Sequence, residues 1–344
     1  MNVSFRQQLL YPLLVALTGL AIASVVDISN LSEQPYYEPF TYALLAVGLY
    51  GSVYGIHLDE LQNHTRIILR AITIGVLLKT IIIGSALYLV TRSGVAFLLG
   101  LTVAQIDPLS VANLLKGDNS KLSPRARTIL GAWSSFDDPM TVLLSIYALY
   151  FFIPQSGTAN LLDSILPFAL GLAENLIFVL VAFLIYKYIK QNSTAMILLL
   201  LVCFVTAVAF KWMLGIALIG LFLRPEIKKL PVIISAAFYI AVLLLGFLLV
   251  NGVSLLQGLA LGIGAILAQV IVGLFLTRDL PRNERLYLAF AQQNGITAMI
   301  LALFFEKDLA GTVGIVAPAI IVINLGYYFF NRFLFRDQSI LSPK

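Results

Sequence analysis

Twelve long apolar runs restrict the fold of this chain more than any other feature of its sequence. An α-helix needs about 20 mainly apolar residues to cross the hydrocarbon core of a bilayer, because it rises about 1.5 Å per residue. Helices also satisfy their own backbone hydrogen bonds inside lipid. With 60% hydrophobic and 11% charged residues in 344, the chain leaves no soluble domain outside the runs. The sequence therefore predicts an all-α polytopic membrane protein with about 12 transmembrane helices, at residues 9–26, 39–56, 67–91, 95–116, 128–152, 161–188, 194–210, 212–223, 231–250, 255–277, 286–305 and 310–335.

The distribution of basic residues predicts the orientation of these spans. Of the 22 lysines and arginines, Lys79 lies inside a span and Arg92, Lys211 and Lys307 fall on one side, which leaves eighteen on the other. Such a bias places the lysine-rich side and both termini in the cytoplasm, and the protein in the plasma or inner membrane. Joining the short run 212–223 to the run before it would divide the basic residues between the two faces, so the two runs are predicted to be separate. The net charge of +5 then reflects membrane topology and contact with anionic lipid, and it does not indicate nucleic-acid binding.

An acidic pair lies deep within the fifth predicted span. Asp137 and Asp138 fall about ten residues into the run, near the middle of the bilayer. Charged side chains cost several kcal/mol at that depth, and where they occur they commonly serve as proton or cation sites. The alternative is a pair that neighbouring helices neutralise for packing alone.

The fourth predicted span contains a residue pair that interrupts helices. Asp107 precedes Pro108, and proline removes a backbone donor but suits the first position of a new helix, for which aspartate is a good N-cap. We therefore expect a half-helix to begin there, with a capped kink as the alternative.

The eleventh predicted span groups Gln293, Asn294 and Gly295 at a similar depth. Spans three to five and spans ten to twelve run in opposite directions, as in inverted-repeat transporters, whose broken helices line an ion site near the midplane. We therefore predict an inverted repeat with two crossing discontinuous helices. Interhelical hydrogen bonding is the alternative use of the amides.

Lys79 lies about twelve residues into the third span, so its ammonium cannot easily reach either surface and needs an acidic partner. Two acids are candidates. Asp137 would make Lys79 a counter-charge of the site, whereas Glu174, near the middle of the sixth span, would make the pair structural. An aqueous cavity is a third option.

These residues resemble a known family. The segment from Ile106 to Lys116 looks like the Thr-Asp-Pro segment of sodium/proton antiporters of the monovalent cation:proton antiporter superfamily, and Trp133 to Thr141 looks like their Glu-Ser-x-x-Asn-Asp segment. The resemblance implies an antiporter that exchanges Na⁺, Li⁺ or K⁺ for H⁺. It also implies a homodimer with one transmembrane domain over residues 1–344, in which core helices (67–152 and 255–336) move against dimerisation or scaffold helices (9–56 and 161–250).

The resemblance also assigns residues to the site. Asp138 matches the family's essential cation- and proton-binding aspartate, Asp137 the preceding Asn or Asp, Asp107 the acid of the crossing helix, and Ser134 a cation ligand. Asp138 and Ser134 would thus hold the transported Na⁺, and neither a cofactor nor enzymatic activity is expected.

The sequence departs from the family pattern at several positions. Ile106 replaces a threonine, whose oxygen Thr102 or Gln105 could supply, and Trp133 replaces a glutamate. Gln269 occupies the basic position of span ten. Because span three is the repeat mate of span ten, we hypothesise that Lys79 supplies the missing counter-charge from the symmetry-related helix.

Competition between a cation and a proton for Asp138 is sufficient to couple opposite fluxes, because a buried carboxylate cannot hold both comfortably. A sodium-coupled solute symporter of the same architecture is the alternative function, although no intramembrane arginine is present to hold an anionic substrate. An intramembrane aspartyl protease is disfavoured because the Tyr-Asp and Gly-x-Gly-Asp motifs are absent.

Overall fold

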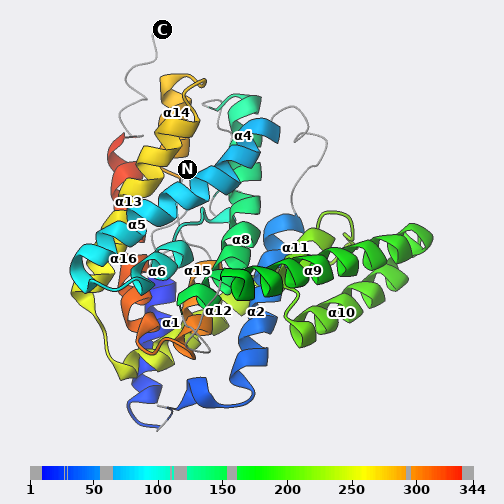
Figure 1. Cartoon of the computed structure of the whole chain (residues 1–344), viewed down its shortest axis with the longest axis horizontal. Helices are drawn as coiled ribbons and strands as arrows, with labels where there is room; N and C mark the ends of the chain where they lie inside the picture. The colour runs from blue at the N-terminus through cyan, green and yellow to red at the C-terminus, as the bar shows by residue number, and fades with distance from the viewer. Residues whose placement is uncertain are drawn as a thin grey trace.

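The computed structural model describes residues 10–26, 28, 30–54, 65–108, 111, 122–152, 161–291 and 296–334. Over these residues the regular structure is helical and contains no β-strand, which confirms the all-α prediction (Figure 1). The helices are α1 (Tyr11–Ala23), α2 (Tyr37–Tyr54), α4 (Thr65–Arg70), α5 (Val76–Thr91), α6 (Val95–Thr102), α8 (Pro124–Phe152), α9 (Leu161–Ile189), α10 (Ser193–Phe210), α11 (Met213–Ile219), α12 (Leu230–Leu248), α13 (Leu255–Leu276), α14 (Arg282–Ala289), α15 (Ile296–Glu306) and α16 (Thr312–Leu334).

Helices long and apolar enough to cross a membrane recur along the described chain. There are six of them: Arg66–Thr91, Ala169–Ile189, Ser193–Phe210, Leu230–Asn251, Leu255–Leu276 and Thr312–Phe330. They support a multi-pass membrane protein, whereas the count of 12 spans stays a prediction. The remaining predicted spans contain shorter helices such as α1 and α6, the less apolar helix α2, or, in the case of α8, the acidic pair.

The seventh and eighth apolar runs form separate helices, as the charge distribution predicts. Helix α10 ends at Phe210, Lys211 takes a left-handed backbone conformation with φ 62°, and α11 begins at Met213. A left-handed residue ends a helix because it turns the chain out of the helical path.

Helices α5, α6, α13 and α16 pack together in one group, and α1, α2, α11 and α12 pack together in a second group. Glycines permit the closest contacts within each group, since a Cβ at Gly262 of α13 would lie 2.9 Å from the carbonyl oxygen of Ala319 of α16. Helix α2 also contacts α8 and α15, which in turn pack against α6 and α16, so the two groups are connected through α8 and α15.

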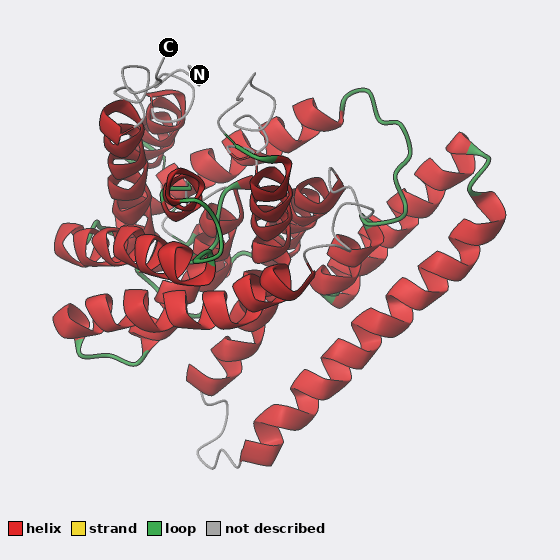
Figure 2. Ribbon diagram, turned by 90° about the horizontal axis from the view of Figure 1, so that it is seen from above, coloured by secondary structure: helices red, strands yellow, loops and turns green. Residues whose placement is uncertain are grey.

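Helices α9 and α10 extend side by side from the rest of the molecule (Figures 1 and 2). Only 17% of the residues in each of their apolar windows are buried within the chain, against 44% for the span Arg66–Thr91. Their exposed side chains are mainly Leu, Ile, Val and Phe, which suits a surface that faces lipid.

Two predicted spans are interrupted, as their sequences indicate. Helix α6 ends at Thr102, residues 103–107 are not helical, and Pro108 and Val111 are helical again. The backbone N–H of Val111 donates to the carbonyl oxygen of Asp107 at 3.1 Å. Helix α14 ends at Ala289, and α15 begins at Ile296. The crossing of these two interrupted segments stays a prediction.

A π-helical turn, Ala71–Gly75, joins α4 to α5. Such a turn adds a residue to the helical repeat and rotates the side chains that follow it. Lys79 lies one turn beyond, on α5, and its side chain is fully buried.

Candidate functional site

The acidic pair lies on α8, and both aspartates are fully buried. The helix continues through Pro139, which has no N–H to donate to the carbonyl of Ser135, four residues earlier. The acidic pair therefore lies next to a backbone carbonyl that lacks its usual intrahelical donor.

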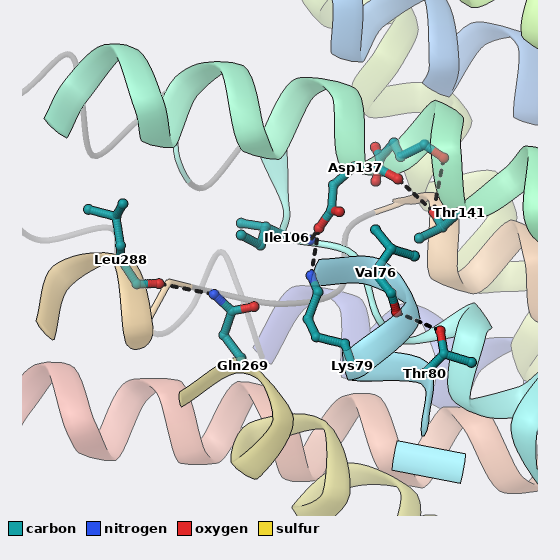
Figure 3. Close-up of polar contacts among 9 residues, drawn as sticks. Val76, Lys79, Thr80, Ile106, Asp137, Thr141, Gln269 and Leu288 are labelled. Atoms are coloured by element: carbon teal, nitrogen blue, oxygen red, sulfur yellow. Dashed lines mark hydrogen bonds and ion pairs between the residues drawn. The ribbon is translucent and has the colours of Figure 1, made fainter. Parts of the chain in front are cut away.

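Asp137 is paired with Lys79 of α5. The ammonium Nζ lies 2.7 Å from Oδ2 of Asp137, and the backbone N–H of Ile106 donates to the same oxygen at 3.0 Å (Figure 3). The Nζ atom also lies 5.6 Å from the centre of the Trp133 ring, one helical turn before Asp137. Helix α5, helix α8 and the interruption after α6 therefore meet at this carboxylate.

Glu174 is not the partner of Lys79. Its side chain is exposed on α9 and accepts a hydrogen bond of 3.0 Å from Nε1 of Trp212. Of the two acids that the sequence offers, the structure pairs Lys79 with Asp137, because α4, the π-helical turn and α5 all pack against α8, whereas α9 lies mainly against α10 and α11.

Asp138 is held by hydroxyl groups from two other helices. Ser52 of α2 donates to its Oδ2 at 2.8 Å, and Thr297 of α15 donates to the same oxygen at 2.9 Å. The other carboxylate oxygen, Oδ1, is buried without a hydrogen-bond partner. No lysine or arginine of the described chain forms an ion pair with Asp138.

Three further predicted site residues are buried in the structure. Ser134 is buried one turn before Asp138, and its hydroxyl donates to the carbonyl of Gly131 at 3.0 Å. Thr102 is buried at the end of α6 and bonds the carbonyl of Leu99. Asp107 is 7% exposed and acts electrostatically on Asp138.

The structure places the predicted amide residues in different surroundings. Gln269 of α13 donates from Nε2 to the carbonyl of Leu288 at 3.0 Å, so it ties α13 to the end of α14 (Figure 3). Its Oε1 and both polar atoms of Gln105 are buried without partners. Gln293 and Asn294 lie outside the described residues.

The two carboxylates therefore differ in their electrostatic surroundings. The charge of Asp137 is matched by an ammonium at contact distance, whereas Asp138 receives hydrogen bonds from neutral hydroxyls. Each of the two carboxylates keeps its Oδ1 buried without a hydrogen-bond partner. Carboxylate and hydroxyl oxygens are the ligands that hard cations such as Na⁺ prefer. No group of three His, Cys, Asp or Glu side chains in the described ranges could hold a resident metal ion.

A multi-pass helical protein with a buried carboxylate between interrupted helices has the construction of an ion transporter. The chain belongs to the sodium/hydrogen exchanger family, whose transmembrane family model matches residues 3–335. Members of this family are transporters. Membership in this family supports the exchange of a cation for protons.

The solved structures similar to this chain include two determinations of one antiporter. The sodium proton antiporter MjNhaP1 from Methanocaldococcus jannaschii at pH 8 has a TM-score of 0.64 and 19% sequence identity, over 95% of this chain and 97% of that one. The structure of the same antiporter from an electron-microscopy map has a TM-score of 0.60 and 19% identity, over 96% and 92%. At this identity the likeness shows the fold. No curated protein matches the chain.

Reasoning from the sequence did not single out Ser52 or Thr297 as site residues. Thr297 follows the amide cluster of the eleventh span by three residues, so its place beside an expected interruption was a usable signal. Ser52 is a single hydroxyl in an apolar run, and nothing in the sequence indicates that it faces α8.

Proposed function

We propose that this chain exchanges a monovalent cation, Na⁺ or Li⁺ and also K⁺ as a candidate, for H⁺ by competition at Asp138. The observation that carries the proposal is the contrast between the two acids. Asp137 already holds a positive charge from Lys79, whereas Asp138 has no ion-pair partner among the described residues. A buried carboxylate without a counter-charge gains most from a proton or a cation, because an uncompensated charge is costly there.

The cation site in this proposal consists of oxygens around Asp138. Oδ1 is free, and hydroxyl oxygens from Ser52 and Thr297 lie within 2.9 Å of Oδ2. Ser134, one turn away on the same face of α8, can join the set if its hydroxyl turns from the carbonyl of Gly131. Asp107 adds negative charge that favours a cation in the site.

Lys79 is the proposed counter-charge of the site. It stands on α5, which packs against α13, the helix that carries Gln269. The inverted-repeat relation between these two helices is part of the proposal. If cation binding weakens the bond from Lys79 to Asp137, the positive charge within the membrane changes during the cycle, and exchange becomes electrogenic.

The proposed mechanical division follows the packing. Helices of residues 67–152 and 255–336 would form the moving core, and helices of residues 9–56 and 161–250 would form the scaffold of a homodimer. The packing of α5 and α6 with α13 and α16, and of α1 and α2 with α11 and α12, supports this division. The protein is proposed to lie in the inner or plasma membrane. Both of its termini are proposed to face the cytoplasm.

The direct experiment measures proton movement in proteoliposomes that contain the purified protein and a pH-sensitive dye. A gradient of Na⁺ or Li⁺ should drive proton movement in the opposite direction. The response to a K⁺ gradient shows whether the cation selectivity extends to K⁺. The matched control is the Asp138→Asn protein at the same density. Absence of a response to every alkali cation would overturn the exchange proposal and favour a sodium-coupled symporter.

A further inference from the structure

The hydroxyl of Ser52 has two acceptors for its single proton. Its Oγ lies 2.8 Å from Oδ2 of Asp138 and 2.9 Å from the carbonyl oxygen of Gly48, one turn earlier on α2. A serine hydroxyl carries one donor and two acceptor lone pairs. It can therefore donate to Asp138 or to Gly48, and when it donates to Gly48 its lone pairs remain available to whatever occupies Asp138.

We propose that Ser52 is a positioning residue that switches its hydroxyl between these two acceptors according to the occupancy of Asp138. This inference rests on the proposed function of Asp138. When the carboxylate is empty, Ser52 donates to Oδ2. When the carboxylate holds a proton or a cation, Ser52 donates to Gly48 and accepts from the acid proton or contributes a lone pair to the cation.

The switch links the ion site to the contact between two groups of helices. Ser52 belongs to α2, which packs with α11 and α12, whereas Asp138 lies on α8 and its second hydroxyl donor, Thr297, lies on α15. Hydrogen bonds to a charged acceptor are about twice as strong as neutral ones. An empty Asp138 is therefore bound to α2 more tightly than a loaded one, and movement of α8 past α2 is hindered until an ion or a proton is bound.

The consequence is that the hydrogen bond from Ser52 limits cation movement that is not coupled to proton movement. An exchanger leaks if its empty site crosses the membrane, since a cation can then move without a returning proton. The charged groups near Asp138 are Asp137, matched by Lys79, and Asp107. The contacts that α2 and α15 make to Asp138 are hydroxyl groups, so Ser52 acts on the empty site through a hydrogen bond and not through a charge.

The test compares cation movement with proton movement in proteoliposomes of the parent protein and of Ser52→Ala. Removing one charge-assisted hydrogen bond should raise the rate of cation flux without proton return about tenfold. The pH of half-maximal exchange should also rise by roughly one unit, because an acid that loses a donor to its charged form holds its proton more tightly. Ser52→Thr keeps the hydroxyl and should behave as the parent does.

The matched control is Ser235→Ala. Ser235 lies exposed on α12, and its hydroxyl donates to the carbonyl of Pro231, so its removal deletes an intrahelical bond without touching the site. If Ser52→Ala does not fold, Ser52→Cys retains a weak donor and should leak to an intermediate degree. A parental ratio of cation to proton flux in a folded Ser52 variant without the hydroxyl, or the same change in Ser235→Ala, overturns the switch. Failure of the parent protein to exchange at all overturns the function itself, so the two failures are distinguishable.

Discussion

The Nζ atom of Lys79 lies 2.7 Å from Oδ2 of Asp137, and both side chains are fully buried. The Coulomb energy of a buried ion pair offsets only part of the cost of removing two charges from water, but the loss of either partner leaves the other charge buried and unpaired. The pair also makes the two adjacent acids different from each other. Asp137 has a counter-charge, whereas Asp138 has none among the described residues. The side chain of Lys79 reaches the acid from the helix that follows a π-helical turn.

The first prediction concerns Asp138. Asp138→Asn should eliminate cation-driven proton movement, because an amide of similar volume cannot release a proton. The protein should still insert and elute as the parent does in size-exclusion chromatography. Retention of most of the exchange in the dye assay would contradict the central role of this carboxylate.

The second prediction concerns the buried pair. Lys79→Gln or Asp137→Asn alone should destabilise the fold by about 3 to 5 kcal/mol, because each leaves an unpaired buried charge. The double variant should recover most of that loss, which a double-mutant cycle on thermal or denaturant unfolding in detergent measures. Glu174→Gln is the control partner. Rescue of Lys79→Gln by Glu174→Gln and not by Asp137→Asn would show that the pair is assigned wrongly.

A third prediction tests the interruption after α6. Asp107→Ala should lower thermal stability, by about 0.5 to 2 kcal/mol if the loss is that of a helix cap, and should weaken transport at the same time. Asp107→Asn can still cap the turn that begins at Pro108, so it should recover the stability without recovering the full transport. Equal stability of Asp107→Ala and the parent would argue against a capped half-helix.

A fourth prediction concerns the pH dependence of stability at the exposed end of α2. Glu38 forms ion pairs with Lys211, which follows α10, and with Lys307, which follows α15. Partial burial acts to raise the pKa of Glu38, but the hydrogen bonds and charges of the two lysines outweigh it and hold the pKa below its usual value.

A carboxylate whose pKa is lowered in the folded state stabilises that state at pH values above its ordinary pKa of about 4.3. This stabilisation is lost as the pH falls through the lower pKa of the folded state. Glu38→Gln should therefore lower the melting temperature slightly at pH 7, since exposed ion pairs contribute about 0 to 1 kcal/mol. The gap to the parent should close as the pH falls below about 4. Glu33→Gln, at an exposed acid that forms no ion pair with a described residue, should show no such gap. A gap that persists unchanged at low pH would contradict the role of the Glu38 charge.

The sequence by itself determined the class of the molecule and indicated that its acidic pair lies within an apolar helix. Long apolar runs commit a chain to helices in lipid, because unsatisfied backbone groups are too costly there. Asp107-Pro108 and the amides before Gly295 marked two interruptions, because their effect on the backbone is local and depends on neighbouring residues. The same locality explains why Lys79 could be identified as a residue that needs an acid.

The choice among partners was made by the tertiary structure. Lys79 was compatible with Asp137 and with Glu174 until the packing of α4, the π-helical turn and α5 against α8 decided between them. The hydroxyls of Ser52 and Thr297 come from helices 86 and 159 residues away from Asp138 in the chain. Apolar spans carry little information about which faces meet, because lipid and neighbouring helices are equally apolar surroundings for them. The residues that complete the site were therefore fixed by helix packing and not by any local pattern.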